Sequence, residues 1–86
     1  MEQHPEGSIL VVDDEPTIRE VCLRTLQKAG YRVETANDGE QALARLEQSN
    51  FDFILTDIRM PGSIGGPDLV DIVKKRSPQT DIVIMT

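Results

Sequence analysis

Residues 9–16 read Ile-Leu-Val-Val-Asp-Asp-Glu-Pro, and this stretch indicates the fold more directly than any other part of the chain. Its first four residues are apolar and mostly β-branched, which is typical of a buried strand in a parallel sheet. Pro16 suits the first turn of a helix, and apolar residues then recur at helical spacing as far as Gly30, which can end the helix. The stretch therefore predicts a β-strand followed directly by an α-helix, with Asp13 and Asp14 between them.

The same alternation of strand and helix continues through the rest of the chain. Further strands are predicted at residues 31–35, 53–56 and 81–86. The first of these alternates in polarity, as expected of a strand at a sheet edge or solvated on one side. Two more helices are predicted between the strands, one capped by Asn37 or Asp38 and one opened by Pro67. Four strands alternating with three helices indicate an α/β fold with an open parallel sheet and right-handed crossovers.

Three aspartates follow predicted strands, and open parallel sheets bind ligands beyond the carboxyl ends of their strands. If the first and third strands are neighbours, the carboxylates of Asp13, Asp14 and Asp57 meet at one edge of the sheet. Their mutual repulsion would destabilise the fold unless a cation compensates for it. Mg²⁺ prefers hard oxygen ligands such as these, and a carboxylate in this position can also act as a nucleophile that forms an aspartyl phosphate.

Each of these aspartates also has a simpler interpretation when it is taken alone. Asp13 and Asp14 could cap the helix that follows them and complement its dipole. Asp57 precedes a segment rich in proline and glycine, so it could be a turn former. The functional interpretation depends on the two sites being brought together in one sheet.

Length and composition exclude several classes of protein. The chain has 86 residues, which is enough for one domain with a modest core. Its formal net charge is −6 and its nine Lys and Arg residues are spread along the chain, which argues against direct nucleic-acid contact. No apolar run approaches the roughly 20 residues of a transmembrane helix, and residues 1–7 lack the features of a signal peptide, so we expect a cytoplasmic protein. Cys22 shares an apolar stripe with Ile18, Val21 and Leu26 and is predicted to be a buried core residue.

Three motifs together resemble the receiver domain of two-component response regulators. They are Ile-Leu-Val-Val-Asp-Asp-Glu-Pro at 9–16, Asp-Gly-Glu-Gln-Ala-Leu at 38–43 and Asp-Ile-Arg-Met-Pro-Gly at 57–62. The resemblance implies a doubly wound, flavodoxin-like sheet with strand order 2-1-3-4 and with the family's fifth strand missing. It divides the chain into a polar N-terminal lead, residues 1–7, and an incomplete receiver domain, residues 8–86.

The resemblance also implies a role for individual residues. Asp57 would accept a phosphoryl group, and Asp13, Asp14 and Asp57 would hold Mg²⁺ together with the backbone carbonyl of Arg59. Thr86 would contact the phosphoryl group. The implied partners are a sensor histidine kinase or phosphotransfer protein, and an output domain or downstream protein. The domain would be a phosphorylation substrate that assists its own phosphoryl transfer and dephosphorylation, and not a turnover enzyme.

The sequence departs from the family pattern on its C-terminal side. Receivers carry a lysine at the end of a fifth strand, which this sequence lacks, and Lys74 and Lys75 belong to the third predicted helix. Two other interpretations therefore stay open: a receiver-like interaction module that is not phosphorylated, and a haloacid-dehalogenase-like phosphatase, whose motif residues 13–17 match only loosely. With no fifth strand, the apolar strand at 82–85 would form an edge. We expect an isolated 86-residue polypeptide to be poorly folded or to dimerise through that edge.

Overall fold

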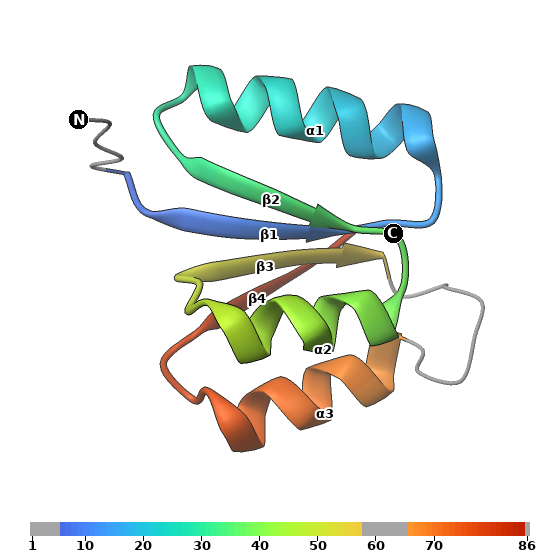
Figure 1. Ribbon diagram of the computed structural model, residues 1–86, viewed down its shortest axis with the longest axis vertical. Coiled ribbons are helices and arrows are strands. Elements are labelled where there is room, and N and C mark those ends of the chain that lie inside the picture. Colours follow the sequence, from blue (N-terminus) through green and yellow to red (C-terminus); the bar gives the residue numbers. More distant parts are fainter. Residues whose placement is uncertain (1–5, 58–65, 86) are drawn as a thin grey trace.

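The computed structural model describes residues 6–57 and 66–85, and within them it contains one four-stranded sheet (Figure 1). The strands are β1 (Ser8–Val12), β2 (Arg32–Ala36), β3 (Phe53–Asp57) and β4 (Asp81–Met85). They are all parallel and lie in the order β2-β1-β3-β4. This order confirms the predicted 2-1-3-4 arrangement, and it places β2, the strand of alternating polarity, at an edge.

Three helices connect the strands, and local sequence explains where each begins and ends. They are α1 (Pro16–Lys28), α2 (Gly39–Gln48) and α3 (Gly66–Arg76). After α1 the chain turns at Gly30, whose φ of 101° is a conformation that favours glycine. Of the two caps predicted for α2, Asn37 and Asp38, the structure selects Asp38, whose side chain accepts a hydrogen bond from the Gln41 backbone N–H at 2.8 Å.

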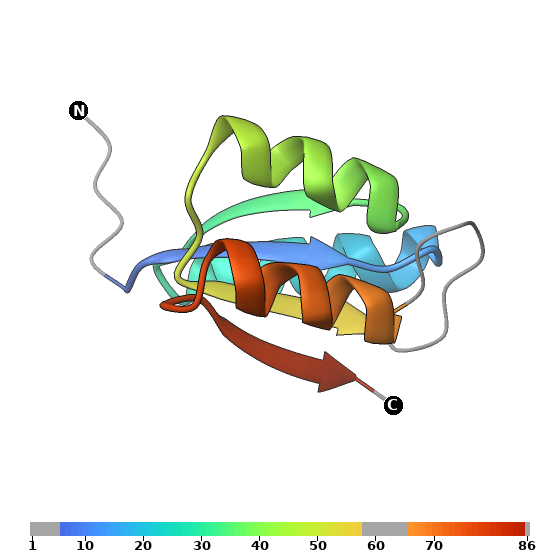
Figure 2. The same cartoon turned by 90° about the horizontal axis from the view of Figure 1, so that it is seen from below.

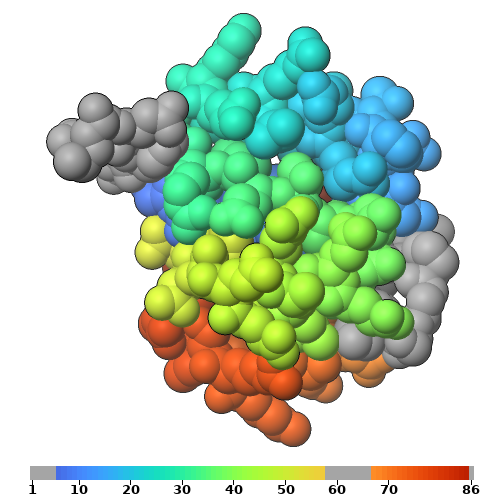
Figure 3. Space-filling view, viewed as in Figure 1, coloured from blue at the N-terminus to red at the C-terminus, as the bar shows by residue number. Residues whose placement is uncertain are grey.

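The helices cover both faces of the sheet, as a doubly wound fold requires. Helix α1 lies on one face, and α2 and α3 lie together on the other (Figures 1 and 2). The space-filling view shows α2 against α3, with α1 at the opposite end of the visible face (Figure 3). The main core lies between the sheet and the α2–α3 pair. Its buried residues are Leu10, Val12, Ala36, Ala42, Phe51, Ile54, Leu69 and Val73.

Helix α1 is less buried than its apolar stripe predicted. None of its residues is fully buried, and Ile18 and Val21 have 45% and 58% of their surface exposed. Cys22 is only half-buried, so the prediction of a buried core cysteine was wrong. Helical spacing correctly placed these residues on one side of α1. It could not reveal how little of the structure packs against that side.

The α1 face of the sheet carries an open apolar groove of about 210 Å³. Its lining residues are Ile9, Leu26, Tyr31, Phe53, Ile54, Leu55 and Val83. Helix α1 packs against β1 and β2, and β4 forms the edge next to β3 (Figure 2). Two apolar residues of that edge strand, Val83 and Ile84, are 51% and 43% exposed. Among the described residues no helix is long and apolar enough to cross a membrane.

Candidate functional site

The strand register brings the acidic residues to the same edge of the sheet. In the parallel pairing of β1 with β3, Val12 lies opposite Thr56. The residues that follow them, Asp13 and Asp57, therefore leave two neighbouring strands side by side. Because both strands point the same way, the two side chains reach the space beyond their carboxyl ends, where ligands bind in open α/β sheets.

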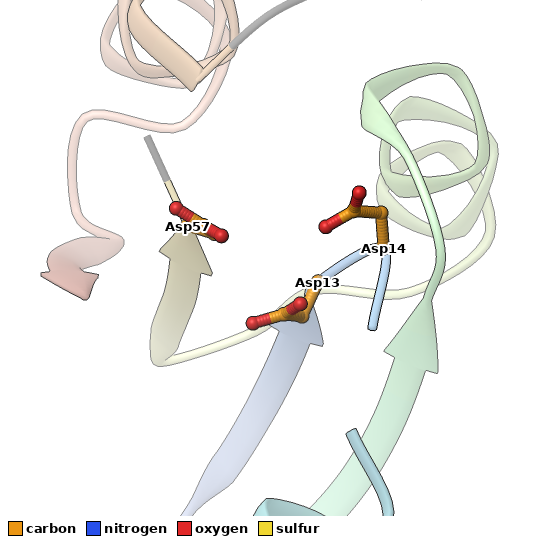
Figure 4. A group of neighbouring side chains, drawn as sticks. All are labelled: Asp13, Asp14 and Asp57. Carbon is orange, nitrogen blue, oxygen red and sulfur yellow. The ribbon is translucent and has the colours of Figure 1, made fainter. Parts of the chain in front are cut away.

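Asp13, Asp14 and Asp57 form a compact cluster, which we call the acidic cluster (Figure 4). Each residue contributes one carboxylate oxygen to a group of three that lie within 4.8 Å of one another. Asp13 is 2% exposed, Asp57 is half-buried and Asp14 is exposed. The cluster thus has a buried base and an open side. The structure brings together all three acidic residues that the sequence singled out.

Asp13 is anchored by hydrogen bonds from both its backbone and its side chain. Its backbone N–H donates to the Ala36 carbonyl at 3.1 Å, which extends the pairing of β1 with β2. Its Oδ1 accepts from the Glu15 backbone N–H at 2.8 Å. The helix cap of α1 is Glu15, which makes no side-chain capping bond. Neither Asp13 nor Asp14 occupies the N-cap position of α1, although the Asp13 side chain binds the backbone of the turn that enters the helix.

Arg19 is a residue that the sequence reasoning missed. Its Nη1 donates a hydrogen bond of 2.8 Å to the backbone carbonyl of Asp13. Arg19 lies in the first turns of α1, where the helix dipole disfavours a cation. The one signal for Arg19 in the sequence is that a basic residue lies near the start of a predicted helix, where the helix dipole disfavours positive charge.

Two neighbouring groups show how the surroundings of the cluster are organised. Thr56 is fully buried. Its hydroxyl donates a hydrogen bond of 3.1 Å to the backbone carbonyl of Asp57, which helps to hold the C-terminal end of β3 in place. Burial raises the pKa of the Cys22 thiol, and the negative charge of Asp13 raises it further.

Two residues with predicted roles, Arg59 and Thr86, lie outside the described part of the chain, as do residues 58–65 of the connection after β3. Their roles stay predictions. Lys74 and Lys75 are exposed on α3, as predicted for residues that take no part in the site.

The acidic cluster has the donor set of a site for a hard divalent cation. Carboxylate oxygens are the ligands that Mg²⁺ prefers, and Mg²⁺ typically binds through one or two carboxylates, water and a phosphate. A cation also offsets the repulsion between three carboxylates held so close together. The arrangement can therefore bind a metal and a phosphoryl group side by side.

Comparison with known proteins identifies the family. The model of the response regulator receiver domain matches residues 9–86, and the chain belongs to this family. This match confirms the resemblance seen in the three sequence motifs. Phosphorylation and Mg²⁺ binding at an acidic pocket are general features of receiver domains, which are in general not enzymes themselves.

Individual relatives agree with this assignment. The transcriptional regulatory protein ResD of Bacillus subtilis is 37% identical over 86 residues, which cover 100% of this chain and 35% of ResD. The structure of the chemotaxis protein CheY4 of Vibrio cholerae is 41% identical with a TM-score of 0.84, over 91% of this chain and 66% of that one. The chain thus spans about a third of ResD.

A third relative has been solved with a metal and with a partner protein. The response regulator TrrA of Thermotoga maritima, in complex with Mg²⁺-BeF, is 42% identical with a TM-score of 0.83, over 90% of this chain and 66% of TrrA. TrrA has also been solved in complex with the histidine kinase ThkA. These solved relatives confirm the predicted flavodoxin-like fold.

Proposed function

We propose that this chain is the phosphoacceptor part of a two-component signalling protein, with Asp57 as the residue that is phosphorylated and with Mg²⁺ held by Asp13, Asp14 and Asp57. One observation carries the proposal: three carboxylate oxygens from two neighbouring strand ends lie within 4.8 Å of one another. Membership of the receiver family supports it. The role of Asp57 as acceptor follows from the resemblance to receiver domains. It is supported by the half-buried position of Asp57 at the end of β3, whereas Asp13 is only 2% exposed.

The donor set fits the metal. When bound, Mg²⁺ neutralises charge on the acidic residues and on the phosphoryl oxygens. The protein contributes the positions of the carboxylates, which are fixed by the register of β1 and β3. Most of the catalytic effect in phosphoryl transfer comes from such positioning and charge stabilisation.

The proposed reaction is a simple exchange at phosphorus. A carboxylate oxygen of Asp57 forms a bond to the phosphorus of a phosphohistidine or of a small acyl phosphate. The bond from phosphorus to the donor nitrogen or oxygen breaks, and the donor keeps the electron pair. A histidine nitrogen then binds a proton from solvent, whereas an acyl phosphate leaves as a carboxylate. The product is an aspartyl phosphate, which water can later hydrolyse. The chain would assist both steps by holding the reacting groups, without acting as a turnover enzyme.

The remaining roles are part of the same proposal. The backbone carbonyl of Arg59 would be a further metal ligand, and Thr86 would donate to a phosphoryl oxygen. A sensor histidine kinase or phosphotransfer protein would supply the phosphoryl group, which is supported by the complex of the relative TrrA with a histidine kinase. The signal would pass to an output domain or a downstream protein, and the cytoplasmic location expected from the sequence stays a prediction.

A labelling experiment with matched variants tests this function. The full-length protein is incubated with acetyl phosphate and Mg²⁺, and intact mass spectrometry records the added phosphoryl groups. We expect one group on the unmodified protein and none on Asp57→Asn. The control is Asp71→Asn, which removes an exposed carboxylate on α3 and should leave labelling unchanged.

The outcomes separate the proposed function from its two rivals. Undiminished labelling of Asp57→Asn would remove Asp57 from the role of acceptor. No labelling of the unmodified protein, either by acetyl phosphate or by a kinase, would favour an interaction module that is not phosphorylated. Steady release of phosphate from small phosphate monoesters would favour a phosphatase.

A further inference from the structure

The backbone of Asp13 is the point on which the acidic cluster depends. Asp13 and Asp14 are consecutive and lie between the end of β1 and the start of α1. A shift of the backbone at Asp13 would therefore move two of the three carboxylates relative to Asp57. Functional sites of this kind need their groups held to within about 0.5 Å, so whatever fixes this backbone also fixes the site.

In the described part of the chain, strand pairing binds the backbone N–H of Asp13 but not its backbone carbonyl. The N–H of Asp13 is bound by the Ala36 carbonyl of β2. The carbonyl of Asp13 accepts a hydrogen bond from the guanidinium of Arg19, at 2.8 Å. Arg19 reaches back from α1, six residues further along the chain. The contact thus joins the helix to the end of the strand across the turn that carries the acidic pair.

The position of Arg19 indicates that this contact is its main role. A cation near the start of a helix is opposed by the helix dipole, and the nearest acidic residues, Asp13, Asp14 and Glu15, precede α1 and are not part of its first turn. Within residues 6–57 and 66–85, Arg19 forms no ion pair with a carboxylate. Its side chain donates a charge-assisted hydrogen bond to the carbonyl of Asp13.

We propose that Arg19 is a positioning residue for the metal site: by binding the Asp13 carbonyl, it holds the strand-to-helix turn in the conformation in which Asp13 and Asp14 face Asp57. This inference rests on the proposed function, since it assumes that the acidic cluster binds a divalent cation. Arg19 contacts neither the metal nor the phosphoryl group in this account. Its effect passes through the backbone of Asp13.

The test measures the affinity for Mn²⁺, a paramagnetic substitute for Mg²⁺, by electron paramagnetic resonance on the full-length protein. Arg19→Met removes the donor and the charge but keeps a long side chain. Arg19→Lys restores a cationic donor. The matched control is Arg24→Met, which removes another arginine of α1 whose exposed ion pair with Glu20 lies away from the cluster.

We expect Arg19→Met to raise the dissociation constant for Mn²⁺ about tenfold, the lower end of the range for residues that support metal ligands from outside the first shell. Arg19→Lys should recover a large part of this loss, and Arg24→Met should bind Mn²⁺ like the unmodified protein. The Mg²⁺ concentration that gives half-maximal labelling by acetyl phosphate should rise in parallel. The labelling rate at saturating Mg²⁺ should stay close to that of the unmodified protein, because the metal then restores the geometry.

Each contrary result has a definite meaning. If Arg19→Met binds Mn²⁺ as tightly as Arg24→Met, or if Arg19→Lys is as weak as Arg19→Met, the positioning role is overturned. If circular dichroism shows that Arg19→Met does not fold, Arg19→Gln replaces it in the same comparison. Failure of the unmodified protein to bind Mn²⁺ or to be labelled would instead overturn the proposed function, so the two failures are distinguishable.

Discussion

At the scale of single residues, the acidic pair shows that two adjacent aspartates can have different roles. Asp13 is 2% exposed and is tied by hydrogen bonds to Ala36, Glu15 and Arg19. Asp14 is exposed and contributes its charge at the open side of the cluster. Substituting Asp13 would disturb the backbone as well as the metal site. Substituting Asp14 changes the charge of the site with less disturbance of the backbone.

Asp14→Asn should therefore uncouple stability from Mg²⁺. A ligand that binds only the folded state stabilises it by RT ln(1 + [L]/Kd), about 1.4 kcal/mol at a tenfold excess over Kd. We expect the melting temperature of the full-length protein to rise with Mg²⁺ and the variant to lose most of that rise. Without metal, the variant should be more stable than the unmodified protein, because one source of repulsion is gone. Melting curves that do not respond to Mg²⁺ in the unmodified protein would argue against the metal site.

Cys22 provides a second prediction at the residue scale. Burial raises the pKa of its thiol, and the charge of Asp13 acts in the same direction. Because the thiolate is the reactive form, a raised pKa lowers the reactive fraction at any given pH. We expect iodoacetamide to alkylate Cys22 with a pH midpoint that is higher in the folded protein than in urea. Equal midpoints in the two states would contradict the environment described for Cys22.

At the scale of secondary structure, helix α2 has the most complete set of local signals. Asp38 caps its first turn, and the Gln41 side chain accepts a return hydrogen bond of 3.0 Å from the Asn37 backbone N–H. The first bond satisfies a backbone donor that the helix end leaves unpaired, and the second holds the residue before the cap against the first turn. The sequence predicted this helix with a choice of two caps, and the structure selects Asp38.

Asp38→Ala should destabilise the protein by about 1 kcal/mol, the usual cost of losing a helix cap. The control is Asp38→Asn, which keeps an oxygen that can accept the same bond and should cost much less. Chemical denaturation of the full-length protein measures both. If the two variants were equally destabilised, the capping bond would not be the reason that Asp38 matters.

The limits of the sequence-based predictions are also clearest at this scale. The β-branched run before Asp13 and the turn formers around Gly30 and Pro67 located the strands and helices closely, because these signals are local. Ile18 and Val21 belong to the apolar stripe from which a buried Cys22 was predicted, and both are exposed. Helical spacing shows which residues share a side, but burial depends on what other elements cover that side.

The acidic cluster was predictable for a different reason. In a parallel sheet the carboxyl ends of adjacent strands meet, so Asp13 and Asp57 follow from the strand order. That order came from the resemblance to receiver domains and not from hydrophobic periodicity. The Arg19 contact could not be deduced, because it depends on how one side chain folds back over a turn.

At the scale of the whole molecule, the two faces of the sheet differ in how well they are covered. The face under α2 and α3 contains the main core. The other face has α1 over β1 and β2 and an apolar groove that extends from Leu26 of α1 to Val83 of β4. The edge strand β4 adds Val83 and Ile84, both largely exposed. An apolar edge of this kind can pair with another chain.

An isolated polypeptide of residues 1–86 should therefore self-associate or fold poorly. Light scattering coupled to size-exclusion chromatography at several concentrations measures association, and circular dichroism measures folding. Val83→Lys places a charge on the exposed edge and should shift the polypeptide toward monomer. A well-folded, strictly monomeric species at all concentrations would show that β4 tolerates an edge position.

The proposed function depends on the chemical identity of the phosphorylated residue. The most direct measurement is to phosphorylate the full-length protein with acetyl phosphate and Mg²⁺, reduce the acyl phosphate with borohydride, and map the reduced residue by peptide mass spectrometry. The account predicts that reduction occurs at Asp57 alone and that chelating Mg²⁺ before phosphorylation prevents it. Reduction at Asp13, at Asp14 or at a carboxylate outside the acidic cluster, or labelling that is indifferent to Mg²⁺, would contradict it.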